Sequence, residues 1–180
     1  MYFKKLSGER CYLSPIDLDD APKYAAWLND PEVTAGLTLA SAVVSLAGER
    51  EALARLAKDH NYAIVDAASD GLVGNVGLMD VDHLHRTAEI GIFIGDKRFW
   101  GKGYGREAMA LLIDYAYARL NLNNIMLRVY AYNERALRSY EALGFTKVGA
   151  LREAVTVDRK AHDVIIMDLL PKDFYRARGR

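Results

Sequence analysis

The segment from Trp100 to Arg106, Trp-Gly-Lys-Gly-Tyr-Gly-Arg, has the residue types of an anion-binding loop. It lies after a predicted strand and before a predicted helix. Glycines at alternate positions let the backbone turn its amide groups into one concavity, and a helix start adds N–H groups without partners and a favourable dipole. Lys102 and Arg106 can add positive charge at the rim. The pattern predicts a pyrophosphate site, although the same glycines also suit a tight turn at a crowded helix–strand junction.

Two other nucleotide-binding motifs do not fit this segment. A P-loop has four residues between its first glycine and its Gly-Lys-Ser/Thr, whereas five residues separate Gly95 from Gly101, and Gly103 stands where the hydroxyl residue should be. A Rossmann site lies at the first strand–helix turn and has an acidic residue near the end of the next strand. Here the loop follows several predicted strands, and the next strand ends in Tyr-Ala-Tyr at residues 130–132, without a carboxylate.

A second pair of residues, Asn133 and Tyr140, is suited to line a site together. They are seven residues apart, which is two turns on one face of a helix, so both side chains can point the same way. Taken alone, Asn133 as an N-cap and Tyr140 as a core aromatic would be the simpler interpretation. Their position after an anion-binding loop and its crossover helix favours a functional role.

Hydrophobic patterns predict the elements that must position these residues. Alternating apolar residues favour strands, and apolar residues at spacings of three and four favour helices. Strands are expected over residues 9–13, 62–67, 72–80, 87–94, 125–131, 145–152 and 164–170, and helices over residues 17–28, 49–58, 101–120 and 133–143. The order predicts an α/β or α+β sheet with one β-α-β crossover at residues 88–131, right-handed if its strands are parallel.

Composition narrows the class of protein. The chain has 180 residues, with 24 Lys+Arg against 24 Asp+Glu, which suits a single domain over residues 1–180 with its core at 9–170. Zero net charge argues against binding to nucleic acid or to an anionic membrane. The N-terminus lacks the apolar core of a signal peptide and no run is long enough to span a bilayer, so we expect a cytoplasmic protein. The single cysteine, Cys11, is expected to be buried, and no spacing of His, Cys and Asp suggests a metal site.

Two motifs in this order resemble a known superfamily. Trp-Gly-Lys-Gly-Tyr-Gly-Arg-Glu-Ala at 100–108 is followed, after a predicted helix and strand, by Asn-Glu-Arg-Ala-x-x-x-Tyr-Glu-x-Leu-Gly-Phe at 133–145. This combination resembles the GNAT superfamily of acetyl-coenzyme A-dependent N-acetyltransferases. Trp-Leu-Asn-Asp-Pro-Glu-Val at 27–33 and Gly-x-Leu-Arg-Glu at 149–153 resemble its branch of ribosomal-protein alpha-amino and spermidine acetyltransferases. Trp100 departs from the usual Arg or Gln, but backbone amides should do most of the phosphate binding.

The resemblance implies a fold and a cofactor site. The fold is a mixed, mostly antiparallel sheet of six to seven strands flanked by about four helices, with a splay between two central parallel strands. Acetyl-coenzyme A, the acetyl donor, would place its pyrophosphate on Trp100, Gly101, Lys102, Gly103, Tyr104, Gly105 and Arg106. Its pantetheine arm would meet main-chain groups of Phe93 and Ile94, and Asn133 would hold that arm or an ordered water.

Two residues are candidates for catalysis. The resemblance places Tyr140 near the departing sulfur, and a phenol with a pKa of about 10 can protonate a thiolate whose conjugate acid has a pKa of about 8.5. An amine acceptor must lose a proton before it attacks, and the resemblance places a carboxylate comparable to Glu89 near the acceptor. Glu89 can instead be an ion-pair partner of Arg86. His83 and His85, in the preceding turn, are expected to be exposed loop residues.

The expected acceptor is a primary amine on a small molecule or peptide, which attacks the thioester of acetyl-coenzyme A directly in a ternary complex. The resemblance places it near the first two helices and their loop, which here is the uncharged run from Val33 to Gly48. A polyamine needs several carboxylates, and only Asp30 and Glu32 lie nearby in the sequence. We therefore favour a protein N-terminal alpha-amine or a small amine with neutral neighbours. A polyamine acetyltransferase and a non-catalytic acyl-CoA-binding module are the alternatives. A homodimer suits this branch, although no segment requires one.

Overall fold

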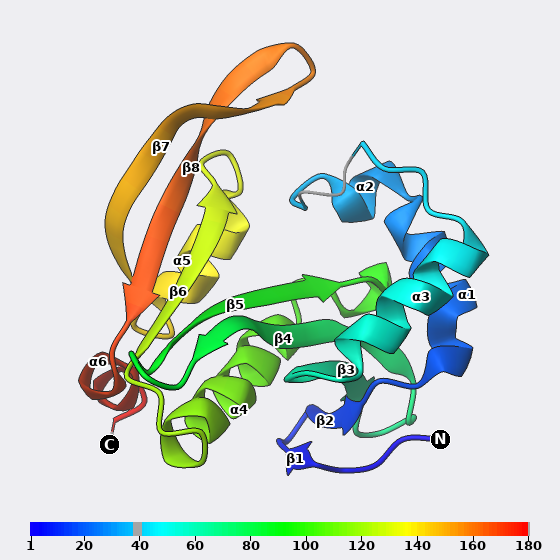
Figure 1. The fold of residues 1–180 in the computed structure, drawn as a ribbon, viewed down its shortest axis with the longest axis horizontal. Helices are drawn as coiled ribbons and strands as arrows, with labels where there is room; N and C mark the ends of the chain where they lie inside the picture. The colour runs from blue at the N-terminus through cyan, green and yellow to red at the C-terminus, as the bar shows by residue number, and fades with distance from the viewer. Residues whose placement is uncertain (38–40, 180) are drawn as a thin grey trace. The chain divides into compact units, whose positions relative to one another are not determined.

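The computed structural model describes residues 1–37 and 41–179 (Figure 1). Within these ranges it has eight strands and six α-helices. The strands are β1 (Leu6–Ser7), β2 (Cys11–Pro15), β3 (Asn61–Asp66), β4 (Leu72–Asp82), β5 (Thr87–Ile94), β6 (Asn124–Tyr130), β7 (Thr146–Val157) and β8 (Lys160–Leu169). The helices are α1 (Ala21–Leu28), α2 (Pro31–Thr34), α3 (Leu46–Leu56), α4 (Tyr104–Ala118), α5 (Glu134–Glu141) and α6 (Pro171–Ala177), with 3₁₀ turns η1 (Leu18–Asp20) and η2 (Lys97–Phe99).

The strand order confirms the predicted mixed sheet. It runs β1-β2-β3-β4-β5-β6-β8-β7. The β5–β6 pair is parallel, and the pairs β1–β2, β2–β3, β3–β4, β6–β8 and β8–β7 are antiparallel. The predicted numbers of strands and helices were too low. β1 has two residues, α2 four and α6 seven, and such short elements show no periodicity from which to predict them.

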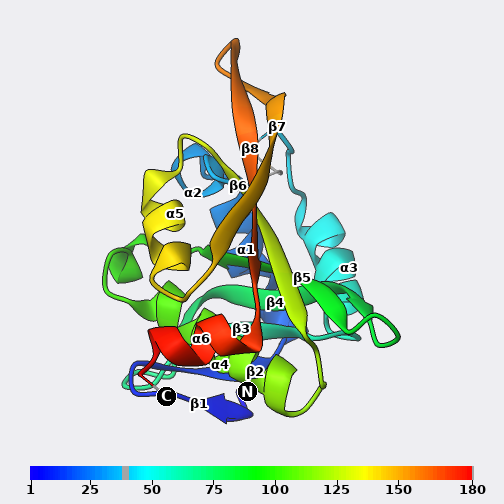
Figure 2. The same ribbon diagram turned by 90° about the vertical axis from the view of Figure 1, so that its left-hand side faces the viewer.

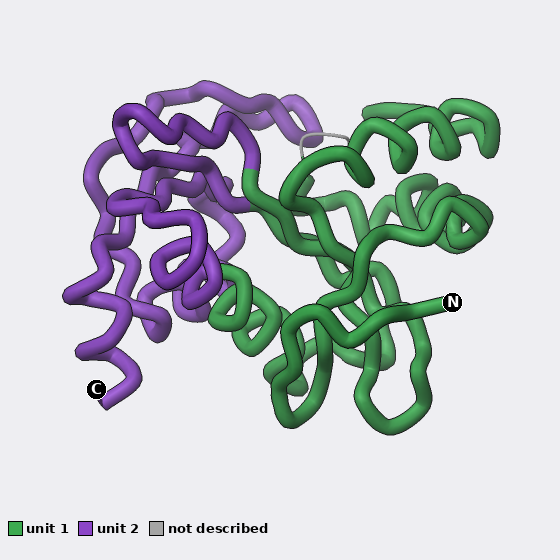
Figure 3. Tube along the Cα trace, turned by 60° about the horizontal axis from the view of Figure 1, so that its bottom comes forward, with its two compact units in different colours: residues 1–78, 91–112 green, residues 79–90, 113–180 purple. Residues whose placement is uncertain are grey.

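The chain divides into two compact units, each described by itself below (Figure 3). The first comprises residues 1–78 and 91–112, and the second comprises residues 79–90 and 113–180. Strands β4 and β5 and helix α4 contribute residues to both units, because each runs across a boundary between these ranges.

In the first unit, strands β2 and β3 are buried on both faces. Tyr12 and Val65, partners across these strands, belong to a cluster that also contains Tyr24 of α1 and Leu53 of α3. Cys11 points to the opposite face, because side chains alternate along a strand, and it is fully buried as expected. Burial raises the pKa of the Cys11 thiol to about 12, so the side chain stays neutral and acts as a small apolar residue.

In the second unit, β6 has two unlike faces, as its alternating sequence predicts. Ile125, Leu127 and Val129 are buried, whereas Arg128 is exposed. Strand β8 pairs with β6 on one side and with β7 on the other, and the β7–β8 hairpin extends beyond the end of β6 (Figure 2). The Tyr117 hydroxyl donates a 2.7 Å hydrogen bond to the carbonyl at the end of β8, which fixes the last turns of α4 in this unit.

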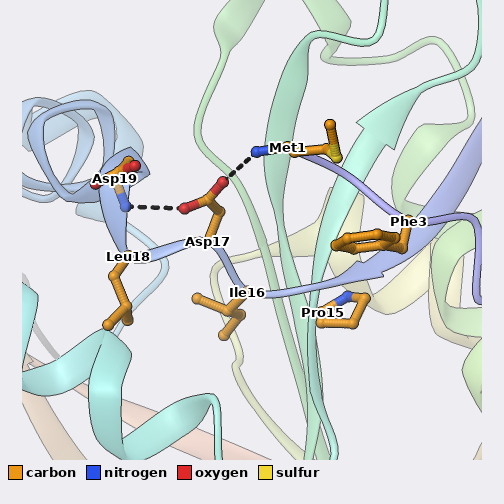
Figure 4. A pocket seen from close by; sticks show the side chains of 7 residues that line it. All are labelled: Met1, Phe3, Pro15, Ile16, Asp17, Leu18 and Asp19. Carbon is orange, nitrogen blue, oxygen red and sulfur yellow. Dashed lines mark hydrogen bonds and ion pairs between the residues drawn. The ribbon is translucent and has the colours of Figure 1, made fainter.

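A shallow pocket of about 500 Å³ lies beside the N-terminus in the first unit (Figure 4). It is lined by Met1, Phe3, Pro15, Ile16, Asp17, Leu18 and Asp19. Asp17 pairs with the terminal amine of Met1 and accepts a hydrogen bond from the Asp19 amide at 3.1 Å. None of the residues predicted for the functional site lines this pocket.

No helix within residues 1–37 and 41–179 is long and apolar enough to cross a bilayer. In the same described ranges, no group of three or more His, Cys, Asp or Glu side chains is arranged to hold a metal ion.

Candidate active site

The predicted anion-binding loop joins β5 to α4 in the first unit. Gly101 and Gly103 have φ angles of 72° and 87°, the left-handed conformation that L side chains rarely adopt. α4 begins at Tyr104, and the Glu107 amide donates a 3.0 Å hydrogen bond to the Gly103 carbonyl. The three amides before Glu107 therefore have no partners within the helix, as an anion site at a helix start requires.

The loop side chains divide into two groups. Lys102 and Arg106 are exposed, as expected of cations at the rim of a site. Trp100 instead donates from Nε1 to the Ile94 carbonyl at 2.8 Å, which fastens the loop to the end of β5. One lone pair of that carbonyl is engaged within the protein, so the oxygen could accept from pantetheine only through its second lone pair.

Tyr104 anchors the start of α4 to the end of β3. Its hydroxyl donates to Oδ1 of Asp66 at 2.7 Å, and Oδ2 of Asp66 accepts from the amide and hydroxyl of Ser69 at 3.0 and 2.6 Å. The bonds from Ser69 and Tyr104 lower the pKa of Asp66, and the bond to Asp66 raises the pKa of Tyr104 to about 12. The Tyr104 phenol is thus hydrogen-bonded to the sheet. Of the groups of Tyr104, its backbone amide is therefore the one predicted to contact the cofactor.

A second anchor of α4, Glu107, was not predicted. Its carboxylate accepts from the amide of Arg10 at 2.8 Å and from Nη1 of Arg10 at 3.2 Å. Burial alone would raise the pKa of Glu107, but these hydrogen bonds outweigh it and the pKa lies below its usual value. Glu107 belongs to the loop motif, yet no local pattern indicates a partner 97 residues away.

Aromatic residues of α1 hold the end of β5. The Phe93 ring lies edge-on to Tyr24 and Trp27, with centroids 5.9 and 6.4 Å apart. Gly74 of β4 approaches so closely that a Cβ there would lie 2.2 Å from the Phe93 carbonyl oxygen. A larger residue at position 74 would displace this main-chain group, which is one of those predicted to face pantetheine.

Glu89 lies on β5 in the second unit, in the stretch that pairs in parallel with β6. Within this unit Thr87, Ala88 and Glu89 of β5 pair with Asn124, Ile125 and Met126 of β6. The Glu89 carboxylate, 14% exposed, forms an ion pair with Nη1 of Arg128 at 2.8 Å. The partner suggested by sequence, Arg86, instead donates to the carbonyl and Oδ1 of Asn121 at 2.7 and 3.0 Å.

The two histidines of the β4–β5 turn are exposed, as predicted. Nδ1 of His85 lies 2.8 Å from a carboxylate oxygen of Asp82, and the amide of His85 donates to the same side chain. His85 therefore helps to shape the turn.

Asn133 and Tyr140 bracket α5 in the second unit. Oδ1 of Asn133 accepts from the Ala136 amide at 3.2 Å, which confirms the N-cap interpretation and leaves Nδ2 as a donor. Tyr140 is partly buried, with its ring centroid 6.0 Å from that of Phe145, and burial raises its pKa to about 12. Gly144 ends this segment at φ 100°, the left-handed conformation predicted for it.

Lys97 of η2, beside the loop, bridges the two carboxylates singled out in the sequence. Its Nζ lies 2.8 Å from Oδ2 of Asp30 and 2.5 Å from Oε2 of Glu32. Hydrogen bonds to the two carboxylates raise the pKa of Lys97, and the bond from Lys97 lowers the pKa of Asp30. Asp30 also caps α2 by accepting from the Glu32 amide at 3.0 Å.

The sequence profile of the acetyltransferase (GNAT) domain matches residues 10–146. The chain belongs to the GNAT acetyltransferase family. N-acetyltransferase p20 of Bacillus licheniformis, a relative whose own function is uncharacterized, is 29% identical over 175 residues, which cover 94% of this GNAT chain and 97% of the relative. Spermidine N(1)-acetyltransferase of Vibrio cholerae is 33% identical over 111 residues, which cover 62% of this chain and 64% of the relative.

Solved structures show the same GNAT fold. The crystal structure of spermidine N-acetyltransferase from Vibrio cholerae in complex with CoA and spermine matches with a TM-score of 0.83 at 24% identity, covering 93% of this chain and 99% of that one. A GNAT-family acetyltransferase from Bacillus anthracis matches with a TM-score of 0.82 at 19% identity, covering 96% and 99%.

GNAT enzymes use acetyl-coenzyme A as the acetyl donor, and the loop of this GNAT enzyme fits such a group. Its two left-handed glycines, the unpartnered amides that follow them and the two exposed cations form the kind of site that binds a pyrophosphate. Of the predicted cofactor contacts, Phe93, Ile94 and residues 100–106 lie in the first unit, and Asn133 lies in the second. Glu89 and Tyr140 also lie in the second.

Proposed function

We propose that this GNAT enzyme moves the acetyl group of acetyl-coenzyme A to a primary amine by direct attack in a ternary complex. The acceptor is a protein N-terminal alpha-amine or a small amine with neutral neighbours. Acetyl-coenzyme A supplies the activated acetyl group. The chain supplies an anion-binding loop, a proton donor and a proton acceptor.

Tyr140 is the proposed proton donor. Because burial raises its pKa to about 12, the phenol keeps its proton throughout the neutral and mildly alkaline range. A group that is always protonated is ready to donate to the departing sulfur in every catalytic cycle. Asn133, two turns away along α5, has a free Nδ2 donor for the pantetheine arm or a water.

Glu89 is the proposed proton acceptor for the ammonium form of the substrate. Its carboxylate is largely shielded from solvent and is oriented by the 2.8 Å ion pair with Arg128. A carboxylate fixed in this way can take a proton from an amine directly or through one water.

The ion pairs that Lys97 forms with Asp30 and Glu32 support the proposed preference for an acceptor with neutral surroundings. Asp30 and Glu32 share the Lys97 ammonium, so they offer little net attraction to the cations of a polyamine. The run from Val33 to Gly48, where the resemblance places the acceptor, adds no carboxylate. Residues 38–40 of this run lie outside the part that the structure describes.

A polyamine acceptor is the second candidate. It is supported by the 33% identity over 111 residues with a spermidine N(1)-acetyltransferase. Under this alternative, carboxylates from elsewhere in the fold would bind the cationic chain.

The deciding experiment mixes the purified enzyme with acetyl-coenzyme A and a panel of amines, and follows the release of free thiol. The panel contains peptides with neutral N-terminal residues, free amino acids, spermidine and spermine. We expect higher kcat/KM for the peptides or amino acids than for the polyamines. Turnover of polyamines alone would overturn the acceptor proposal, and absence of turnover with every amine would contradict the transfer itself.

A further inference from the structure

The turn between β1 and β2 is fastened to the first turn of α4. The Glu107 carboxylate accepts hydrogen bonds from the backbone amides of Arg10 and Cys11 at 2.8 and 3.4 Å. Gly8 makes room for it, because a Cβ at that position would lie 2.1 Å from Oε1 of Glu107. The Arg10 carbonyl accepts from the Ala67 amide at 2.9 Å. Both backbone groups of Arg10 are therefore engaged, and the residue is fixed beside the loop.

The Arg10 side chain lies beside Gly103 of the loop. Nε and Cδ of Arg10 are 3.7 and 3.9 Å from the position that a Cβ at Gly103 would occupy. Nη1 pairs with Oε2 of Glu107 at 3.2 Å, and the side chain remains 52% exposed. A guanidinium has five N–H donors, so this ion pair leaves donors on Nε and Nη2 available beside the loop amides.

We propose that Arg10 is a third cation of the cofactor site and donates to a phosphate group of coenzyme A. This inference rests on the proposed assignment of residues 100–106 as the pyrophosphate-binding loop. Lys102 and Arg106 are exposed and lie on the loop itself, whereas Arg10 comes from a turn far away in the sequence and is held in place by its backbone. A planar guanidinium suits a phosphate well, because it can donate two parallel hydrogen bonds.

The competing explanation is that Arg10 has only a structural role, as the ion-pair partner of Glu107. The two explanations differ in what they predict for the partner carboxylate. If Arg10 binds phosphate, Glu107→Gln keeps an oxygen that accepts from the backbone amides, releases the guanidinium and removes a negative charge near the anion. If Arg10 has only this structural role, Arg10→Gln and Glu107→Gln break the same ion pair and have the same effect on the Kd for coenzyme A and on the melting temperature.

The test is isothermal titration of the enzyme and its variants with coenzyme A and with 3′-dephospho-coenzyme A, together with thermal melting of each variant. We expect Arg10→Gln to raise the Kd for coenzyme A about fivefold to tenfold, as for a lost charge-assisted hydrogen bond. We expect Glu107→Gln to leave the Kd equal or lower. Arg50→Gln, a change of an exposed arginine on α3, is the matched control and should leave the Kd unchanged.

The two ligands distinguish which phosphate Arg10 contacts. If the effect of Arg10→Gln disappears with the dephospho ligand, the contact is to the 3′-phosphate, and if it persists, the contact is to the pyrophosphate. Arg10→Lys keeps the charge and serves as the test if Arg10→Gln is too unstable to measure. It should bind coenzyme A with an intermediate Kd.

Two results would overturn this proposal. One is an unchanged Kd for coenzyme A in Arg10→Gln. The other is equal weakening of binding in Arg10→Gln and Glu107→Gln, with equal loss of melting temperature. Failure of the unmodified enzyme to bind coenzyme A would instead overturn the assignment of the loop.

Discussion

The hydroxyl of Tyr104 lies 2.7 Å from Oδ1 of Asp66, and this hydrogen bond joins the first residue of α4 to the last residue of β3. Asp66 is buried, and its carboxylate also accepts two hydrogen bonds from Ser69. The start of α4, whose first amides have no partners within the helix, is thereby fixed to the sheet of the first unit. A binding loop that is already ordered loses less conformational entropy when it takes up a ligand.

Tyr104→Phe should therefore weaken both the fold and the cofactor site. Removal of the hydroxyl leaves the buried Asp66 carboxylate short of one donor, and we expect a loss of about 1–3 kcal/mol in the free energy of unfolding. We also expect a higher Kd for coenzyme A, because the loop is less well ordered. Urea denaturation and isothermal titration measure the two effects.

Tyr2→Phe is the matched control for this change. The Tyr2 hydroxyl donates to both carboxylate oxygens of Asp20, at 3.0 and 2.8 Å, in the same unit but outside the loop. It should lower stability without changing the Kd for coenzyme A. Equal effects of both substitutions on the Kd would show that Tyr104 has no special connection to the loop.

Tyr140→Phe should lower kcat by about 10²-fold or more, because it removes the proposed proton donor while keeping the ring. The Kd for coenzyme A should change little. Tyr117→Phe is the control, since it removes a buried hydroxyl whose 2.7 Å hydrogen bond to the Leu169 carbonyl is structural. It should lower the melting temperature and leave kcat near its original value. A Tyr140→Phe enzyme with full kcat would contradict the proposed mechanism.

The pH dependence of kcat/KM should carry no descending limb from Tyr140 below about pH 11. Burial raises the pKa of this phenol to about 12, and a proton donor is lost only as the pH rises through its own pKa. In the range from neutral to about pH 10, the profile should follow the ammonium form of the substrate, from which Glu89 is proposed to take a proton, and should fall as that form is lost. Tyr140→Phe should give a profile of the same shape at a lower level. A descending limb near pH 9 that disappears in Tyr140→Phe would show that the phenol titrates lower than its burial implies.

Local requirements made the loop predictable from the sequence. Gly101, Gly103 and Gly144 adopt left-handed φ angles that favour glycine, so the residue type itself indicates the conformation. The strand from Thr87 to Ile94 also has the predicted bounds, because turn residues flank an apolar run at both ends. In each case the information lies within a few neighbouring residues.

Contacts between distant segments could not be predicted in this way. The bonds from Arg10 to Glu107 and from Lys97 to Asp30 join charged residues that look like solvated surface groups in the sequence. Glu89 was expected to pair, if at all, with Arg86, which is near in sequence, but the register of β5 on β6 brings Arg128 to it. Strand β7 extends to Val157, beyond its predicted end at residue 152. Most of its residues are exposed, so the sequence shows no alternation of apolar and polar residues from which to predict the longer strand.

Glu89→Gln should lower kcat/KM by about 10²-fold, because an amide cannot take the proton of the ammonium substrate. Arg128→Gln breaks the same 2.8 Å ion pair but leaves the carboxylate in place, so we expect only a severalfold loss. Steady-state kinetics with the best amine of the panel, together with melting temperatures, would measure both changes. If the two variants lose activity and stability equally, Glu89 acts only as the ion-pair partner of Arg128.

Lys97→Met should shift the acceptor preference toward cationic amines. The substitution keeps an apolar side chain of similar length but frees the carboxylates of Asp30 and Glu32, which share the Lys97 ammonium at 2.8 and 2.5 Å. Because these groups are partly exposed and screened by solvent, we expect a modest rise of about threefold to tenfold in kcat/KM for spermidine. The rise should shrink in high salt, and kcat/KM for peptides with neutral N-terminal residues should stay the same. Lys58→Met, a change of an exposed lysine after α3, controls for the general loss of one positive charge. If both lysine variants raise spermidine turnover equally, the effect belongs to net charge and the carboxylate pair has no part in acceptor choice.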